Sequence, residues 1–158
     1  MTAISPLRLV VLGDSLAYGT GASQVDQTVG PRLAQALRRE GYDVDLRVLA
    51  VPGATSRELA AQLRRAVLLG VDLALIVVGA NDLTRLVPPA QAAATEAAGG
   101  VVAPVSAELA RAFAADPALF SRDRFHPSSA GYARIADILT PYVVTAARSH
   151  SAALQPEH

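Results

Sequence analysis

The chain has 158 residues, 51% of them hydrophobic and 18% charged, a composition typical of a single globular domain that buries its own core. Its 14 basic and 14 acidic residues balance to a formal net charge of zero, so the overall charge favours neither nucleic acid nor an anionic membrane as a partner. Cysteine and lysine are both absent, which excludes disulfides, thiolate metal sites, cysteine nucleophiles, lysine Schiff bases and lysine-containing phosphate-binding loops.

The first half of the chain alternates apolar runs with segments of helical periodicity. The runs are rich in Leu and Val and are followed by glycine-containing turns, as expected for strands buried in a parallel sheet. We predict strands at 7–12, 44–51 and 71–78, and helices at 31–39 and 56–69. This order of strands and helices indicates an α/β fold with a right-handed parallel sheet.

The second half of the chain is richer in alanine and less regular. We predict helices at 91–98, 108–115 and 130–144, the last limited by Pro141, and one more short strand at 101–105. The sheet would then have at least four strands.

The ends of the chain lead to two further expectations. We expect one domain over residues 1–147 and a disordered C-terminal tail over residues 148–158. The N-terminus lacks the charged start and cleavage site of a signal peptide, and the longest apolar stretch, residues 66–80, is too short to span a bilayer. We therefore expect a cytoplasmic protein with no integral membrane segment. Its oligomeric state stays open.

Polar turns follow each of the three predicted strands in the first half. They are Gly13–Ser15, Gly53–Thr55 and Gly79–Asp82. Because the carboxyl ends of parallel strands meet at one edge of the sheet, and ligands bind there in open α/β folds, these turns are expected to form one site.

Ser15 follows the first strand and has two interpretations. Serine after a strand is a common helix cap, and taken alone Ser15 favours that structural role. Its position at the edge of the sheet also suits a nucleophile. Gly53 and Asn81 are similarly ambiguous, because each suits either a polar turn or a hydrogen-bond donor facing a cleft.

Asp123 and His126 lie three residues apart just before the last predicted helix. On a turn this spacing lets the carboxylate bind one ring nitrogen while the other faces a nucleophile. A histidine that only completes the turn is the alternative. His126 is, however, the only histidine in the predicted domain, since His150 and His158 lie in the tail, and a metal site lacks ligands.

These blocks together resemble the SGNH, or GDSL, hydrolases. The four marker residues of that family correspond to Ser15 in GDSL, Gly53 in PGAT, Asn81 in GAND and His126 in DRFHP. The resemblance runs from about residue 7 to residue 141. It implies a three-layer α/β/α, flavodoxin-like fold with a parallel sheet of four to five strands.

The resemblance also implies a mechanism. Ser15 would attack an ester carbonyl, His126 would take its proton and Asp123 would orient the imidazole, with an acyl-enzyme as intermediate. The backbone N–H groups of Ser15 and Gly53 and the side-chain amide of Asn81 would form the oxyanion hole. The expected substrate is a small-molecule ester with a small or medium acyl group, and the reaction needs neither cofactor nor metal.

One departure from the family pattern keeps a second hypothesis open. The segment between Asp82 and Asp123 is shorter than the family usually has, as if a strand–helix unit were missing. The alternative is a noncatalytic domain of the same fold that binds a small ester or a partner. A nucleotide-binding Rossmann domain is disfavoured, because GDSLAYGTG lacks the required glycine spacing.

Overall fold

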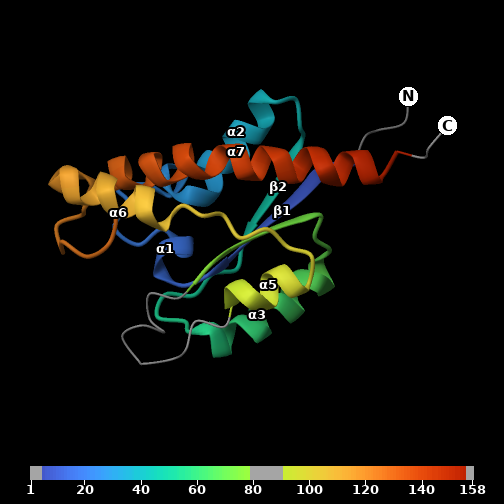
Figure 1. Cartoon of the computed structure of the whole chain (residues 1–158), viewed down its shortest axis with the longest axis horizontal. Helices are drawn as coiled ribbons and strands as arrows, with labels where there is room; N and C mark the ends of the chain where they lie inside the picture. The colour runs from blue at the N-terminus through green and yellow to red at the C-terminus, as the bar shows by residue number, and fades with distance from the viewer. Residues whose placement is uncertain (1–4, 79–90, 156–158) are drawn as a thin grey trace.

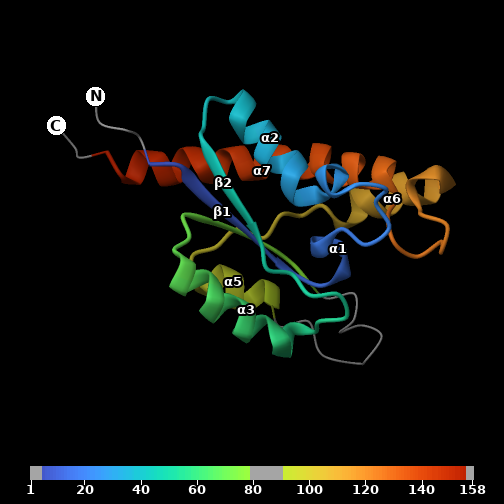
Figure 2. The ribbon, with the colours of Figure 1, turned by 180° about the vertical axis from the view of Figure 1, so that it is seen from behind.

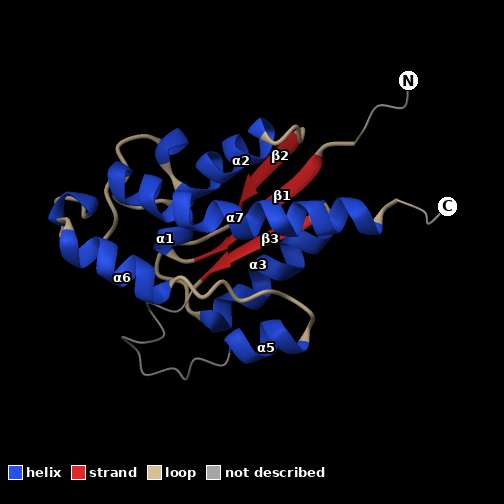
Figure 3. Cartoon of the chain, turned by 45° about the horizontal axis from the view of Figure 1, so that its top comes forward, coloured by secondary structure: helices blue, strands red, loops and turns tan. Residues whose placement is uncertain are grey.

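The computed structural model describes residues 5–78 and 91–155. Its centre is a parallel sheet with the strand order β2-β1-β3, formed by β1 (Leu7–Gly13), β2 (Val44–Val48) and β3 (Leu73–Val77) (Figure 3). In the register, Leu9 of β1 pairs with Leu46 on one side and Leu73 on the other. All three strands of the first half were predicted, although β2 and β3 are shorter than expected.

The predicted strand at 101–105 is wrong, and within the described residues the sheet has three strands rather than four to five. Two features of this segment disfavour pairing. Val101 is 77% exposed, so it has no layer to pack against. Pro104 has no N–H to donate to a neighbouring strand.

Helices cover both faces of the sheet. The pair α2 (Val29–Arg39) and α7 (Ser129–Ala153) lies on one face, and the pair α3 (Ser56–Leu69) and α5 (Gln91–Ala97) lies on the other (Figure 1 and Figure 2). The remaining elements are short: α1 (Ser15–Tyr18), α6 (Ser106–Ala115), and the 3₁₀ turns η1 (Val25–Gln27) and η2 (Pro117–Leu119). The three-layer α/β/α arrangement expected from the sequence is present.

The core is organised around β1, which is the central strand. Leu9 packs on the side of α2 and α7, whereas Val10 and Leu12 pack with Leu59 of α3. All three β1 residues have no exposed surface. A strand buried on both faces needs a run of apolar residues, which explains why the β1 signal in the sequence was strong.

α7 is longer than predicted. It continues through Pro141 and includes residues 148–153, which were expected to be part of a disordered tail. Proline removes one hydrogen bond from a helix interior, but Leu139 and Val143 are buried on either side of it and hold the helix against the core. At the far end Arg148 pairs with Glu40, at 2.6 Å.

No helix among the described residues is both long and apolar enough to cross a membrane.

Candidate active site

Ser15 lies at the first position of α1, directly after β1. The cap of this short helix is Asp14, whose carboxylate accepts a hydrogen bond from the Leu16 N–H at 3.0 Å. Asp14 is buried and Ser15 is partly exposed. The capping role considered for Ser15 therefore belongs to its neighbour, and the Ser15 hydroxyl is available for another contact.

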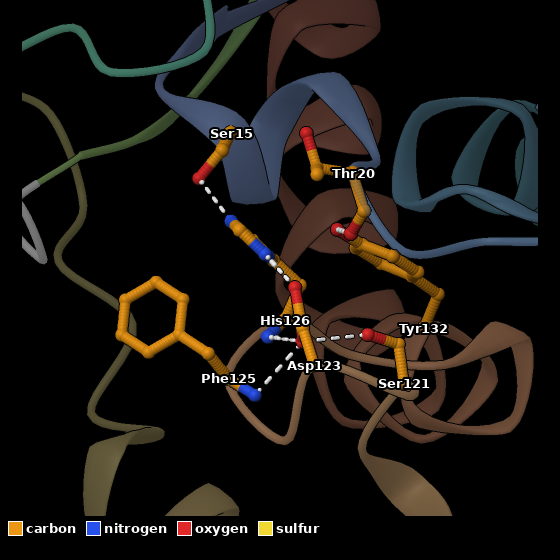
Figure 4. A network of polar contacts seen from close by, with 7 residues as sticks. All are labelled: Ser15, Thr20, Ser121, Asp123, Phe125, His126 and Tyr132. Carbon is orange, nitrogen blue, oxygen red and sulfur yellow. Dashed lines mark hydrogen bonds and ion pairs between the residues drawn. The ribbon is translucent and has the colours of Figure 1, made fainter.

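That contact is made with His126. The Ser15 Oγ lies 3.1 Å from His126 Nε2, and His126 Nδ1 lies 2.6 Å from Asp123 Oδ2. The imidazole thus stands between the hydroxyl and the carboxylate (Figure 4). Ser15 and His126 are 111 residues apart in the sequence. The structure therefore brings together the three residues that the sequence singled out as nucleophile, base and orienter.

Asp123 is held by a dense set of donors. Its Oδ1 accepts hydrogen bonds from the Ser121 hydroxyl at 2.7 Å and from the backbone N–H groups of Phe125 and His126 at 2.9 Å each (Figure 4). These bonds, and first of all the one to the His126 ring, hold the pKa of Asp123 well below its usual range. The carboxyl group is therefore an anion facing the imidazole.

The loop that carries Asp123 and His126 is closed on itself. Phe120 and Pro127 form an antiparallel bridge, and the Ser121 N–H donates to the His126 carbonyl at 2.8 Å. Arg124 at the tip has a φ of 57°, which is uncommon for a residue other than glycine. A closed turn of this kind gives the imidazole a defined direction.

Gly53 lies in the loop after β2, at the same edge of the sheet as Ser15. Val51, two residues earlier, donates its N–H to the Gly13 carbonyl at 3.0 Å. Gly53 has a φ of 83°, and among the described residues no atom beyond its chain neighbours lies within 4 Å of where a Cβ would stand. The glycine is thus required by its backbone conformation. The motif that contains Asn81 lies outside the described residues.

Gln62 supports the site and was missed by the sequence reasoning. This buried side chain on α3 accepts from the Gly13 N–H at 2.7 Å and donates to the Gly13 carbonyl at 2.9 Å. It therefore fixes the end of β1, next to Asp14 and Ser15. The available signal was a polar residue on the buried stripe of α3, between Leu59 and Ala66.

Within residues 5–78 and 91–155 no group of three or more His, Asp or Glu side chains could hold an ion.

The chain is similar to known proteins in sequence and in structure. The model of the GDSL-like Lipase/Acylhydrolase family matches residues 11–102. The GDSL-like esterase Rv1075c of Mycobacterium tuberculosis is 29% identical, over an alignment covering 96% of this chain and 70% of the relative. That alignment spans 221 positions, more than the chain has, so the relative contains residues with no counterpart here. This agrees with the shortened segment noted in the sequence.

Two solved structures support the fold. The crystal structure of TesA superposes with a TM-score of 0.70 at 22% identity, covering 88% of this chain and 99% of TesA. The psychrotrophic esterase EstA from Pseudoalteromonas sp. superposes with a TM-score of 0.61 at 20% identity, covering 87% of this chain and 96% of EstA. The predicted flavodoxin-like α/β/α fold is confirmed, with fewer strands than expected.

Proposed function

Because the chain belongs to the GDSL-like lipase/acylhydrolase family, we propose that it is a serine ester hydrolase acting through an acyl-enzyme on esters of small or medium acyl groups. The observation that carries this proposal is the pair of contacts that His126 makes, one to Ser15 and one to Asp123. The ring nitrogens are assigned accordingly: Nδ1–H donates to Asp123, and Nε2 accepts from the Ser15 hydroxyl.

The reaction has two steps. Ser15 Oγ attacks the ester carbonyl carbon while its proton moves to His126 Nε2, and the Asp123 carboxylate stabilises the imidazolium. The carbon–oxygen bond to the alcohol then breaks, and His126 returns the proton to the departing alkoxide. Water, deprotonated by His126, attacks the acyl-enzyme, and the acid leaves as Ser15 recovers its proton.

The developing oxyanion needs hydrogen-bond donors at the same edge of the sheet. Ser15 is the first residue of α1, so its N–H has no acceptor within the helix. We assign this N–H, the Gly53 N–H and the Asn81 amide to the oxyanion hole. Removing one such donor typically slows a reaction by ~10²–10³-fold.

The position of Phe125 favours a substrate whose apolar acyl group lies near the imidazole. Its ring is 61% exposed and meets the His126 ring edge-on, with the ring centres 4.9 Å apart. An exposed aromatic ring beside the reacting groups suits a small-molecule ester with some apolar surface.

The noncatalytic alternative was kept because a chain with a shortened segment need not bring His126 close to Ser15. The 3.1 Å separation between Ser15 Oγ and His126 Nε2 supports the catalytic proposal over this alternative. A binding domain also has no need for an anionic Asp123 behind the imidazole.

Hydrolysis of p-nitrophenyl acetate, butyrate and octanoate tests the proposal. Ser15→Ala and His126→Ala should each lower kcat/KM by at least ~10³-fold, because the triad acts as a unit. Ser149→Ala and His150→Ala are matched controls on α7 and should keep wild-type rates. A fluorophosphonate should phosphonylate Ser15 alone, with loss of fluoride and of the serine proton. Inert wild-type protein, or Ser15→Ala protein with full activity, would refute the proposal.

A further inference from the structure

The two halves of the site come from opposite ends of the chain and meet through the segment that follows α1. Residues 19–23 leave the nucleophile turn and lie against the loop bearing Asp123 and His126 and against the first turn of α7. Three separate contacts join the two segments. None of them involves the reacting atoms.

The first contact is made by Tyr132, which has no exposed surface. Its hydroxyl donates to the Thr20 carbonyl at 2.8 Å (Figure 4). The Thr20 N–H in turn donates to the Ser15 carbonyl at 2.9 Å. Burial, with the nearby charges of Asp14 and Asp123, raises the pKa of Tyr132 above its usual range, so the hydroxyl keeps its proton. Tyr132 thus connects α7 to the turn that holds Ser15.

The second contact depends on Gly21. A Cβ at this position would lie 2.4 Å from the Pro127 carbonyl oxygen and 3.0 Å from the His126 Cβ. Gly21 also has a φ of 98°, a conformation that favours glycine. Only a residue without a side chain lets this segment come so close to the loop that carries Asp123 and His126, called the histidine loop below.

The third contact links Ser23 to α7, where the Ser23 N–H donates to the Ser129 hydroxyl at 2.9 Å. Ser129 is the first residue of α7, and His126 lies three residues before it. The contact therefore ties the two segments together a short distance from the imidazole.

From these contacts we propose that Tyr132 and Gly21 are positioning residues that set the separation between Ser15 Oγ and His126 Nε2. The predicted effect on kcat rests on the proposed function. The predicted effect on the Ser15–His126 separation does not. The reason is geometric: a shift of about 1 Å between reacting groups can cost ~10²-fold in rate while leaving substrate binding unchanged.

Four variants in matched pairs test the kinetic consequence. Tyr132→Phe should lower kcat by ~10-fold and Gly21→Ala by ~10²-fold, with KM within about twofold of wild type. Tyr142→Phe makes the same change elsewhere on α7. Gly41→Ala introduces a similar backbone strain, because Gly41 has a φ of 95°, and no atom of the described residues beyond its chain neighbours lies within 4 Å of the new Cβ. Both controls should keep kcat within about twofold.

The pairs also define what overturns the proposal. It fails when folded Tyr132→Phe matches Tyr142→Phe in kcat, or when folded Gly21→Ala matches Gly41→Ala. Where either test variant does not fold by circular dichroism, Ser129→Ala decides instead. This substitution removes only the acceptor of the Ser23 N–H. A kcat about threefold lower or more supports the proposal, and an unchanged kcat overturns it.

A measurement that needs no turnover separates this proposal from the esterase assignment. In ¹⁵N-histidine-labelled wild-type protein, Ser15→Ala should change the His126 Nε2 chemical shift, because the ring loses its partner. In the Tyr132→Phe background, the same substitution should change it much less. If this smaller shift change is seen but the wild-type protein hydrolyses no ester, the proposed function is refuted and the positioning role stands. If Ser15→Ala changes the shift fully in the Tyr132→Phe background and the wild-type protein is active, only the positioning role is refuted.

Discussion

At the scale of single residues, the site depends on how completely Asp123 is satisfied. Both carboxylate oxygens have partners, although the side chain is 49% exposed. An exposed aspartate without such partners could rotate away from the imidazole and form its hydrogen bonds with water instead. Here the turn geometry holds the anion against His126, and the carboxyl group resists protonation.

The pH dependence of hydrolysis tests this role of Asp123. Its lowered pKa means that the carboxyl group is ionised throughout the range above pH 5, so Asp123 itself should add no pH dependence there. We expect log kcat/KM to rise with pH on the acid side with a slope of one. Asp123→Asn should lower kcat by ~10³–10⁴-fold, because the amide favours the wrong tautomer.

Rates of p-nitrophenyl butyrate hydrolysis between pH 5 and pH 9 provide the measurement. An acid limb with a slope of two would show that the Asp123 carboxyl group takes up a proton in this range, and would contradict the role assigned to it. Asp116→Asn, on the 3₁₀ turn η2, is a control that should leave the profile unchanged.

At the scale of elements, the amino ends of β1 and β3 are joined by an ion pair at the opposite end of the sheet from Ser15. The Arg8 guanidinium binds both carboxylate oxygens of Asp72, at 2.9 and 2.8 Å, and the Arg8 N–H donates to the same group. His150 of α7 approaches Asp72 at 3.7 Å. Three elements therefore converge on one carboxylate, and the Arg8 side chain holds its pKa at about 2.

Asp72→Asn should lower the free energy of unfolding by about 1–2 kcal/mol at pH 7. Asp45→Asn, which removes a more exposed ion pair with Arg47, should cost less than about 0.5 kcal/mol. The folded-state pKa of Asp72 lies below its value in an unfolded chain, ~3.9, so its contribution is complete above about pH 5. It is lost as the pH falls towards 2.

Urea unfolding at pH 7, pH 4 and pH 3 measures both changes. The difference between wild type and Asp72→Asn should narrow between pH 4 and pH 3. A difference that widens there, or an Asp72→Asn protein as stable as Asp45→Asn at pH 7, would contradict the assigned role.

At the scale of the whole molecule, α7 connects the site to the core. Its first turn follows the histidine loop, and its buried residues, among them Ile135 and Leu139, pack in the same cluster as α2 and β1. The last buried residue of the helix is Ala147. The helix continues to Ala153, but its final turns contribute little to the core.

Two truncations test how far α7 is needed. A chain ending at residue 147 loses the exposed Arg148–Glu40 pair and the 3.7 Å contact of His150 with Asp72, and should lose no more than about 1 kcal/mol of stability. A chain ending at residue 142 also loses the buried Val143, Val144 and Ala147, and should lose about 3–6 kcal/mol. Thermal melting and ester hydrolysis measure the outcome. Equal stability of the two chains would show that the helix is not anchored by these residues.

Much of the fold and of the candidate site was predictable from local patterns. The strands at β1, β2 and β3 and the helix α3 follow from short-range periodicity and turn residues, because a buried strand or amphipathic helix repeats its apolar positions within a few residues. Ser15 and Gly53 were recognisable because they follow predicted strands at one edge of the sheet. Asp123 and His126 were recognisable from their spacing on a turn, and all four from the resemblance to the SGNH hydrolases. Their catalytic roles, and that of Asn81, remain predictions.

Other properties depended on contacts between distant residues, which no local pattern contains. The segment at 101–105 has strand-like residues but no neighbour to pair with, and α7 passes through Pro141 because the core holds it. The residue patterns indicated Ser15, Asp123 and His126 as candidate reacting groups and placed Ser15 at the carboxyl edge of the sheet. That Ser15 and His126 meet depends on the folded chain, because the contacts of Tyr132, Gly21 and Gln62 join residues far apart in the sequence.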